Sequence, residues 1–322
     1  MSHELDFTKG RAAIAYVGET PWHGLGQQLE AGAPIETWQV EAGMDFSLEE
    51  TPALFSIGAK IGIVPDRKVL IRSDSLTPLA VVSNAYQVVQ PKEVLEFYRD
   101  LTEKAGFQLE TAGVLKGGRK YWALANMGKE AKVLDDTIKG YLLLGTACDG
   151  SMSTTAMFTS IRVVCNNTLG FAMDEAKGNS RVVRINHRTT FNDAKVKAQL
   201  GIAATSWDNF MKHVEAWSET KVTTSDAEDY FSEIASYKGN DGEIVVSDKT
   251  VSTLLDLFQG RGKGSELESA KDTVWGLVNA VTEFVDHHRG RSNDTRMDRA
   301  WFGDGLATKE LASNLADELV GI

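Results

Sequence analysis

The sequence predicts an α+β fold, in which an antiparallel sheet of β-hairpins packs on helices and a mostly helical C-terminal half follows. Two observations carry this prediction. Between residues 107 and 164, stretches rich in β-branched and aromatic residues are joined by glycine-containing turns. After residue 190, apolar residues recur at helical spacing. We therefore expect an α+β core in residues 1–189 and an acidic, mainly helical region in residues 190–322.

The N-terminal elements read as short strands followed by one helix. Apolar stretches alternate with turn signals at the start of the chain, which is typical of strands. One hairpin is predicted from residues 54–64 to residues 69–73, with its turn at residues 65–68. Pro91 then opens a helix, because an N–H in the first helical turn has no intrahelical partner to lose. The apolar face of this helix consists of Val94, Phe97, Tyr98, Leu101 and Ala105.

The central strands are predicted to form two hairpins, which hold most of the basic residues discussed below. Residues 107–115 and 119–127 flank a Lys-Gly-Gly turn. Residues 141–148 and 152–164 flank an Asp-Gly-Ser turn. Because these strands follow one another without helices between them, the sheet is expected to be antiparallel and not that of a doubly wound nucleotide-binding fold.

Two further elements complete the expected core. A short helix through Leu169 is predicted, with Asn166 or Asn167 as its N-cap. Residues 181–187 are predicted to form a last strand, since Val182, Val183 and Ile185 sit among basic residues.

Helix start signals are frequent in the C-terminal half. Thr190 and Asp193 have the spacing of a capping box, and so do Ser225 and Glu228. The helix after the first box carries an apolar stripe of Trp207, Phe210, Met211, Val214 and Trp217. Further helices are expected around residues 248–258, 267–288 and 307–320.

Charge is distributed unevenly along the chain. The formal net charge is −11, which argues against indiscriminate binding of nucleic acid by the whole surface. Residues 116–188 nevertheless carry 11 basic and 6 acidic side chains, whereas residues 214–322 carry 11 basic and 21 acidic ones. Such a basic strip either pairs with the acidic flanks or forms an anion-binding surface, most naturally for a phosphate backbone.

Composition and the N-terminal sequence indicate the cellular compartment in which the protein is expected. Apolar residues make up 42% of the chain without a run of about 18 of them, and we expect no membrane association. The N-terminus lacks the basic-then-apolar pattern of a secretion signal. The two cysteines, Cys148 and Cys165, are too few for a disulfide framework. We expect them to be buried as small apolar residues in a cytosolic protein.

The sequence holds no specific catalytic motif. The glycine-rich stretch at residues 260–265 lacks the spacing of a phosphate-binding loop and follows a helix where a strand is required. Asp286, His287 and His288 form the densest metal-like cluster. Adjacent histidines on a helix point about 100° apart, however, and cations in a last helical turn complement the helix dipole. We therefore expect neither a nucleotide nor a metal cofactor.

Three segments resemble a known family. Residues 20–26 read TPWHGLG, residues 148–151 read CDGS and residues 162–169 read RVVCNNTL, with WFG at residues 301–303. Together they resemble the phage/plasmid-like family built on the domain of unknown function 932. The resemblance implies a phage or plasmid protein that acts in a bacterial cytoplasm. The order of helix, hairpin strands and helix is also similar to that of ring-forming single-strand annealing proteins, which bind DNA on a basic β-hairpin without metal or nucleotide.

Our leading hypothesis is a single-stranded DNA binding and annealing protein that acts in homologous recombination as a ring or filament of identical subunits, with a host or phage recombination protein as a further partner. The turn of the first central hairpin and the strands that follow it would supply the phosphate contacts. These residues are Lys116, Arg119, Lys120, Arg162, Arg181, Arg184 and Arg188. Tyr121, Trp122 or His187 would stack on bases. Because neighbours on a strand face opposite ways, at most one of Tyr121 and Trp122 is expected in the core.

Two alternatives belong to other classes of protein. An anti-defence or host-takeover protein would use the acidic half to imitate DNA and bind a host protein. A phosphodiesterase would use Asp286, His287 and His288.

Overall fold

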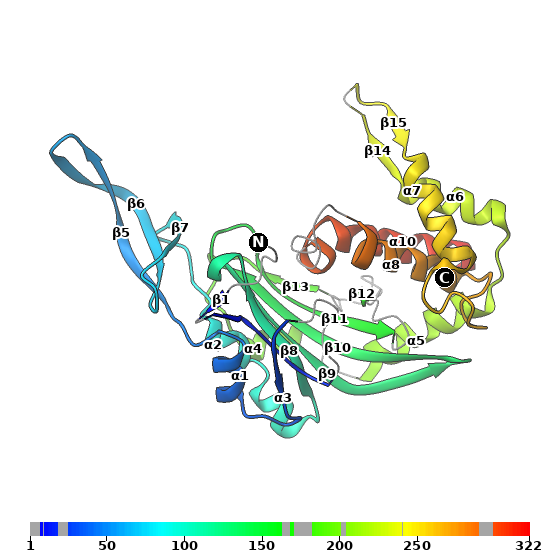
Figure 1. The fold of residues 1–322 in the computed structure, drawn as a ribbon, viewed down its shortest axis with the longest axis horizontal. Helices are drawn as coiled ribbons and strands as arrows, with labels where there is room; N and C mark the ends of the chain where they lie inside the picture. Colours follow the sequence, from blue (N-terminus) through cyan, green and yellow to red (C-terminus); the bar gives the residue numbers. More distant parts are fainter. Residues whose placement is uncertain are drawn as a thin grey trace.

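The computed structural model describes residues 7–8, 10–18, 25–162, 168–170, 182–200, 204–239, 241–289 and 299–322. Its α+β architecture, with antiparallel sheets and a helical C-terminal half, agrees with the prediction (Figure 1). An eight-stranded sheet with the order β12-β11-β10-β9-β8-β3-β4 lies at the centre, and β13 also pairs with β11. Within it, only β3 and β4 pair in parallel among the described strands.

The strands of this central sheet are β3 (Ile14–Val17), β4 (Gln27–Leu29), β8 (Gln108–Leu115), β9 (Lys120–Val133), β10 (Asp136–Ala147), β11 (Thr154–Arg162), β12 (Thr168–Gly170) and β13 (Val182–Ile185). A separate two-stranded ribbon joins β1 (Phe7–Thr8) and β2 (Arg11–Ala12).

Both predicted glycine turns are confirmed. β8 reverses into β9 through the short 3₁₀ turn Lys116–Gly118, in which Gly117 and Gly118 have φ angles of 70° and 103°. β10 reverses into β11 at Gly150, whose φ is 76°. Glycine adopts these left-handed angles without the steric cost that a Cβ would impose.

The helix predicted through Leu169 is wrong. Residues Thr168–Gly170 form strand β12, which pairs with β11 from Thr159 to Ile161. The outer edge of β11 presents backbone N–H and C=O groups that a further strand satisfies, and this tertiary pairing outweighs the local capping signal. Asn166 and Asn167 lie outside the described residues. The strand predicted at residues 181–187 is confirmed by β13.

A second sheet, β5 (Leu48–Ile57), β6 (Lys60–Arg72) and β7 (Pro78–Ser83), projects away from the central sheet (Figure 1). Its hairpin does not turn at residues 65–68, as the sequence predicted. The chain reverses at Gly58, whose φ is 59°, and residues 65–68 lie inside β6. The proline and aspartate signals mark an irregularity within the strand, where Asp66 adopts a φ of 59°.

Helices cover one face of the central sheet: α1 (Ile35–Glu41), α2 (Pro91–Glu96), α3 (Arg99–Lys104), α4 (Asp193–Leu200) and α5 (Ala204–Glu219). The helix predicted after Pro91 is confirmed as the pair α2 and α3. The predicted stripe of α5 is buried in the same core as Tyr121 and Leu142 of the sheet. Asn192, and not Thr190, caps α4, since its Oδ1 accepts the N–H of Lys195 at 2.8 Å.

The C-terminal segment covers the other face. Trp301, Phe302 and Leu306 pack with Trp122 and Tyr141 in a separate apolar cluster. The rings of Trp122 and Trp301 meet edge to face with centroids 5.0 Å apart. Because both faces are covered, neighbouring side chains on one strand are both buried. Several residues that were predicted to contact DNA are therefore in the core.

The remaining helices form a bundle with its own core: α6 (Thr224–Ile234), α7 (Asp248–Asp256), α8 (Val274–Glu283) and α10 (Asp304–Val320). They agree with the expected helices in number and order, although the helix expected from residue 267 begins only at Val274. Thr223 and Asp226 form the capping box in place of Ser225 and Glu228. Between α6 and α7, strands β14 (Ser236–Lys238) and β15 (Ile244–Val246) form a projecting ribbon (Figure 1). In the described part of the chain, every helix is too short or too polar to cross a membrane.

Candidate nucleic-acid interface

Three chain segments that carry predicted site residues meet at one end of the central sheet. The β8–β9 turn contacts the β10–β11 turn, because the N–H of Cys148 donates to the carbonyl oxygen of Arg119 at 2.8 Å. The segment after β13 joins them, since His187 Nε2 lies 3.1 Å from the carbonyl oxygen of Met152. The fold therefore places Lys116, Arg119 and Arg188 at the same end of the sheet.

Exposed arginines lie at this end. Arg119, Arg184 and Arg188 all have exposed side chains. Arg119 Nε donates to the carbonyl oxygen of Leu79 at 3.0 Å, which leaves the rest of its guanidinium at the surface. None of the three forms an ion pair with a carboxylate that the structure describes. These arginines can therefore accept an external anion.

Other predicted contact residues are buried, and the sequence-based assignment was wrong for them. Lys120 is only 7% exposed, although it follows Arg119 directly. Tyr121 is packed in the core and donates its hydroxyl proton to the carbonyl oxygen of Val89. Trp122 is equally buried on the opposite face, against Trp301. Since helices cover one face and the C-terminal segment covers the other, both aromatic side chains are in the core and neither can stack on a base.

His187 holds backbone segments together and is not available to bases either. Its ring is 8% exposed and stacks on Tyr86, with centroids 4.5 Å apart and planes 13° apart. Its Nδ1 lies 3.0 Å from the carbonyl oxygen of Gln87, while Nε2 faces Met152. His187 therefore joins the β10–β11 turn to the segment that leads into α2.

Arg162 does not belong to this end of the sheet. It pairs with Ile138 at the far end of β11, whereas Arg184 pairs with Thr155 near the start of that strand. The eight residue steps from Thr154 to Arg162 span roughly 27 Å of extended strand. Arg181, which was also predicted to contact phosphate, lies outside the described residues. The predicted basic residues consequently do not form one continuous track.

The far end of the sheet carries basic residues that the prediction did not name. Lys132 is exposed on β9, and Lys129 and Lys139 are partly exposed near it. Strand pairing places Lys132 opposite Thr137 and Lys139 opposite Ile161, next to Arg162. All three lysines contributed to the basic count of residues 116–188. These lysines lie close together only because of the register of β9, β10 and β11. Their spacing along the chain therefore did not indicate a shared surface.

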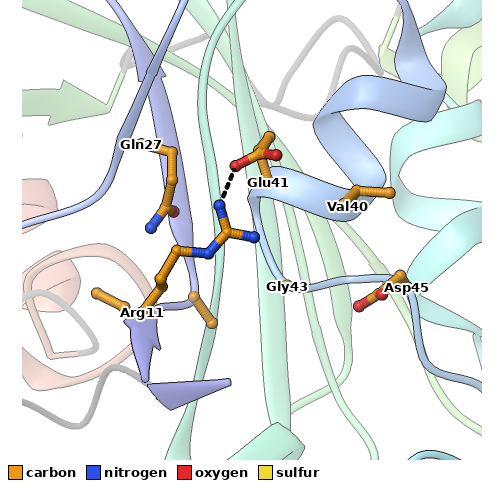
Figure 2. Close-up of a pocket in the computed structure, with 8 residues that line it drawn as sticks. Arg11, Gln27, Val40, Glu41, Gly43 and Asp45 are labelled. Atoms are coloured by element: carbon orange, nitrogen blue, oxygen red, sulfur yellow. Dashed lines mark hydrogen bonds and ion pairs between the residues drawn. The ribbon is translucent and has the colours of Figure 1, made fainter. Parts of the chain in front are cut away.

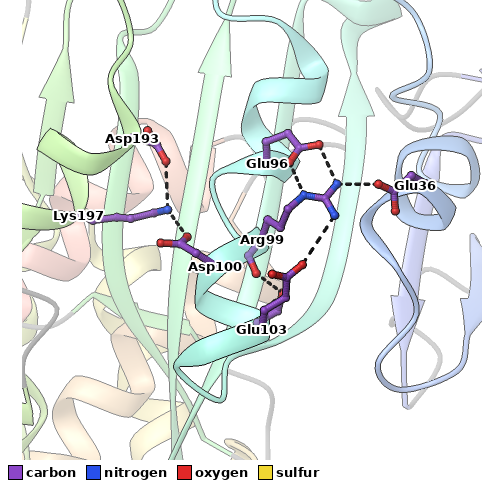
Figure 3. A network of polar contacts seen from close by, with 8 residues as sticks. Glu36, Glu96, Arg99, Asp100, Glu103, Asp193 and Lys197 are labelled. Carbon is purple, nitrogen blue, oxygen red and sulfur yellow. Dashed lines mark hydrogen bonds and ion pairs between the residues drawn. The ribbon is translucent and has the colours of Figure 1, made fainter.

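Other cations are neutralised by neighbouring carboxylates. Arg99 lies among Glu36, Glu96 and Glu103, with Nη2 2.7 Å from Glu36 Oε1 (Figure 3). Lys197 bridges Asp100 and Asp193. Hydrogen bonds from Arg99 hold the pKa of the Glu96 carboxyl below its usual value. This surface joins α1, α2, α3 and α4, and its charges serve the fold.

Two hollows differ sharply in size. The smaller, of about 20 Å³, lies between Arg11, Gln27, Glu41 and Asp45 (Figure 2). An ion pair of 2.9 Å between Arg11 and Glu41 crosses it, and the space suits about one water molecule.

The larger hollow, of about 520 Å³, lies at the base of the β5–β6 hairpin beside Arg67, Lys68 and Asn84. Lys68 Nζ donates to Glu50 and to the carbonyl oxygen of Tyr86, the residue that stacks on His187. This hollow therefore adjoins the end of the sheet where the exposed arginines lie.

Cys148 and Asp286 are both buried in the described part of the chain, whereas Cys165 lies outside the described residues. Cys148 is buried, and burial raises the pKa of its thiol to about 12, so it is no nucleophile. Asp286 pairs with Lys309, and both side chains are almost fully buried. The described residues contain no group of three His, Cys, Asp or Glu side chains that could hold a metal ion.

Arg72 fixes the β8–β9 turn to the second sheet. It is 4% exposed, and its guanidinium lies 4.0 Å from the centroid of the Phe46 ring. It donates to the carbonyl oxygen of Gly117 at 3.2 Å and to both carboxylate oxygens of Asp74 at 2.9 and 2.8 Å. These contacts position the turn that presents Arg119.

Replacing Asp74 by asparagine is expected to lower the free energy of unfolding by about 1 kcal/mol at pH 7, because it weakens two charge-assisted hydrogen bonds. Hydrogen bonds from Arg72 hold the pKa of Asp74 below its usual value, which is about 3.9. The contribution is therefore complete above about pH 4 and is lost as pH falls through the folded-state pKa.

Urea denaturation at several pH values measures this effect. The difference between wild type and D74N should shrink towards pH 3, while Glu49→Gln, at an exposed position on the same sheet, should change little at any pH. A pH-independent difference would contradict the role of the Asp74 charge.

An antiparallel sheet covered on both faces, with arginines at one end that pair with no described carboxylate, defines an α+β protein with a candidate polyanion-binding surface. The chain belongs to the family described as "Domain of unknown function (DUF932)", whose model matches residues 78–301, and the predicted resemblance to the domain of unknown function 932 is thereby confirmed. The match begins at β7 and includes the central hairpins, whereas β5 and β6 precede it. No curated protein and no solved structure matches the chain.

Proposed function

We propose that this protein binds and anneals single-stranded DNA of a phage or plasmid during homologous recombination, as a homo-oligomer and without nucleotide or metal. The observation that carries the proposal is the group of Arg119, Arg184 and Arg188, which are exposed at one end of an antiparallel sheet without a described carboxylate partner. Three exposed guanidinium groups that form no ion pair with a carboxylate in the described part of the chain favour a polyanionic ligand.

Burial of the aromatic candidates changes the expected mode of binding. Since Tyr121, Trp122 and His187 are packed in the interior, affinity should come from phosphate contacts and show little base preference. Such a surface would leave the bases free to sample a complementary strand, as annealing requires. The lysines at the far end of β9 and β10 offer a second contact for a long strand.

Charge reversal tests the proposal in a fluorescence anisotropy titration with a labelled single-stranded oligonucleotide of about 50 nucleotides. We expect the double variant Arg119→Glu/Arg188→Glu to bind at least about tenfold more weakly, because it removes two phosphate-binding groups worth roughly 1 kcal/mol each. The slope of log affinity against log salt should become shallower by about 0.7 for each phosphate that the variant no longer neutralises.

The matched control is Lys212→Glu/Lys249→Glu, which alters net charge equally at exposed positions on α5 and α7. Equal losses in both double variants would indicate a general charge effect. If the wild-type protein does not bind the oligonucleotide at low salt, the proposal is rejected. Co-purification with a host protein in place of DNA would then favour the anti-defence alternative.

A further inference from the structure

Two projecting ribbons carry large apolar side chains that are exposed to solvent. The first arm is the outer part of β5 and β6, residues 53–63, in which Ile57 is 74% exposed. The second arm is the ribbon of β14 and β15, in which Ile244 is 73% exposed. The other exposed apolar residues on the two arms are Leu54, Phe55, Ile61, Ile63, Tyr237, Val245 and Val246. Contiguous apolar surface of this kind marks an interaction site.

The register shows that both faces of the first arm are apolar. Leu54 pairs with Ile63, which places these side chains on one face. Phe55 pairs with Gly62, whose missing side chain leaves room for the aromatic ring on the other face. A two-stranded ribbon has no interior to bury these groups, and an isolated ribbon is marginally stable in water. The first arm therefore needs a surface outside its own strands.

Both arms also have strand edges that no described strand covers. β5 is an edge strand along its whole length, and β7 pairs only with the inner part of β6, from Arg67 to Ile71. β14 and β15 pair only with each other. Such edges present rows of backbone donors and acceptors that add a strand from another chain.

Charge distinguishes the two arms. The first arm, residues 53–63, contains one basic side chain, Lys60, and no acidic one. The second arm, residues 236–246, contains one basic and two acidic side chains. Contact between like arms would bring like net charges together, whereas contact between unlike arms brings opposite charges together. The arms lie at opposite ends of the molecule, so one chain cannot join its own two arms (Figure 1).

We propose that the first arm of one copy docks on the second arm of the next copy. This head-to-tail contact is heterologous, and repetition of it generates a ring if the rotation closes or a filament if it does not. The inference specifies the interface for the oligomer in the proposed function. It can be tested without DNA, so failure of the interface and failure of DNA binding are distinguishable.

Native mass spectrometry and light scattering of the full chain test the interface. The first-arm variant, Ile57→Glu/Ile63→Glu, removes apolar surface from the first arm and reverses its positive charge. The second-arm variant, Ile244→Lys/Val246→Lys, removes apolar surface from the second arm and reverses its negative charge. Wild type should form oligomers, and each double variant alone should be monomeric. Leu319→Lys, at a residue 44% exposed on α10 outside both arms, should assemble like wild type.

Mixing the two double variants provides the decisive observation. Each retains one intact arm, so the mixture should form a one-to-one heterodimer that grows no further. If the second-arm variant assembles alone, the first arms pair with each other and the proposal is wrong. A wild-type protein that remains monomeric at every concentration tested overturns it as well, and circular dichroism of both variants shows whether they remain folded.

Discussion

Replacing Gly276 by alanine is expected to lower the free energy of unfolding by about 3 kcal/mol through overpacking, although alanine favours a helix by about 1 kcal/mol relative to glycine. Gly276 lies in the first turn of α8, where its N–H donates to Thr273 Oγ1 at 3.1 Å. A Cβ atom at this position would lie 2.0 Å from the carbonyl oxygen of Ala270. Since the nearest atom belongs to the backbone, no side-chain rotation relieves the clash.

The backbone around Ala270 has little freedom to move. Asp135, in the β9–β10 turn, accepts the N–H groups of Glu268 and Ser269 at 2.9 and 3.2 Å. On the other side, the N–H of Val274 donates to the carbonyl oxygen of Thr220 at 3.0 Å. A shift large enough to admit a methyl group would break contacts with both the sheet and α5, and the penalty should therefore exceed the gain in helix propensity.

Urea denaturation followed by circular dichroism measures the effect of Gly276→Ala. The control is Asn314→Ala, an exposed position on α10, where the same product residue should stabilise the protein by up to about 0.7 kcal/mol through propensity alone. Equal stability of G276A and N314A would show that the backbone before α8 can shift to admit the methyl group without a large loss of stability.

The sequence predicted the strands and helices well where one local signal coincided with the tertiary environment. The glycines at 117 and 150 mark real hairpins because the chain needs left-handed backbone angles there. The first hairpin was misplaced because residues 65–68 also have turn chemistry, and only the pairing of β5 with β6 shows that Gly58 makes the reversal. Likewise, Leu169 belongs to a strand because β11 provides a partner.

The candidate site was predictable only in part. Arg119, Arg184 and Arg188 are exposed as a nucleic-acid surface requires, and their basic neighbourhood is visible in the sequence. The alternation rule failed for Tyr121 and Trp122, since it assumes that one sheet face meets solvent. Trp301 and Phe302, which cover the second face, lie far from Tyr121 and Trp122 in the sequence. No local sequence pattern predicts such a contact.

Replacing Asp286 by alanine is expected to lower the free energy of unfolding by about 3–5 kcal/mol, because it removes the carboxylate from a buried ion pair. The side chains of Lys309 and Asp286 are only 2% and 7% exposed. Burial lowers the pKa of Lys309, and the Asp286 carboxylate opposes that shift. Without the carboxylate, the folded protein must either hold a poorly compensated ammonium group or release its proton.

The pH dependence identifies that cost as one of charge. In the Asp286→Ala variant, the unfolded state binds more protons than the folded state below the usual lysine pKa of about 10.4, so stability rises with pH. The penalty relative to wild type should therefore be smaller at pH 9 than at pH 7. The double variant Asp286→Leu/Lys309→Met, which replaces both charges by apolar groups, should recover most of the loss.

Asp256→Ala is the matched control, since it breaks an ion pair of 2.7 Å with Arg261 at the surface and should cost less than about 1 kcal/mol. If D286A costs no more than D256A, or if its penalty does not change between pH 7 and pH 9, the buried pair does not stabilise the junction of α8 and α10. A large penalty in both D286A and the double variant would instead assign the loss to packing, because the double variant leaves no buried charge at this position.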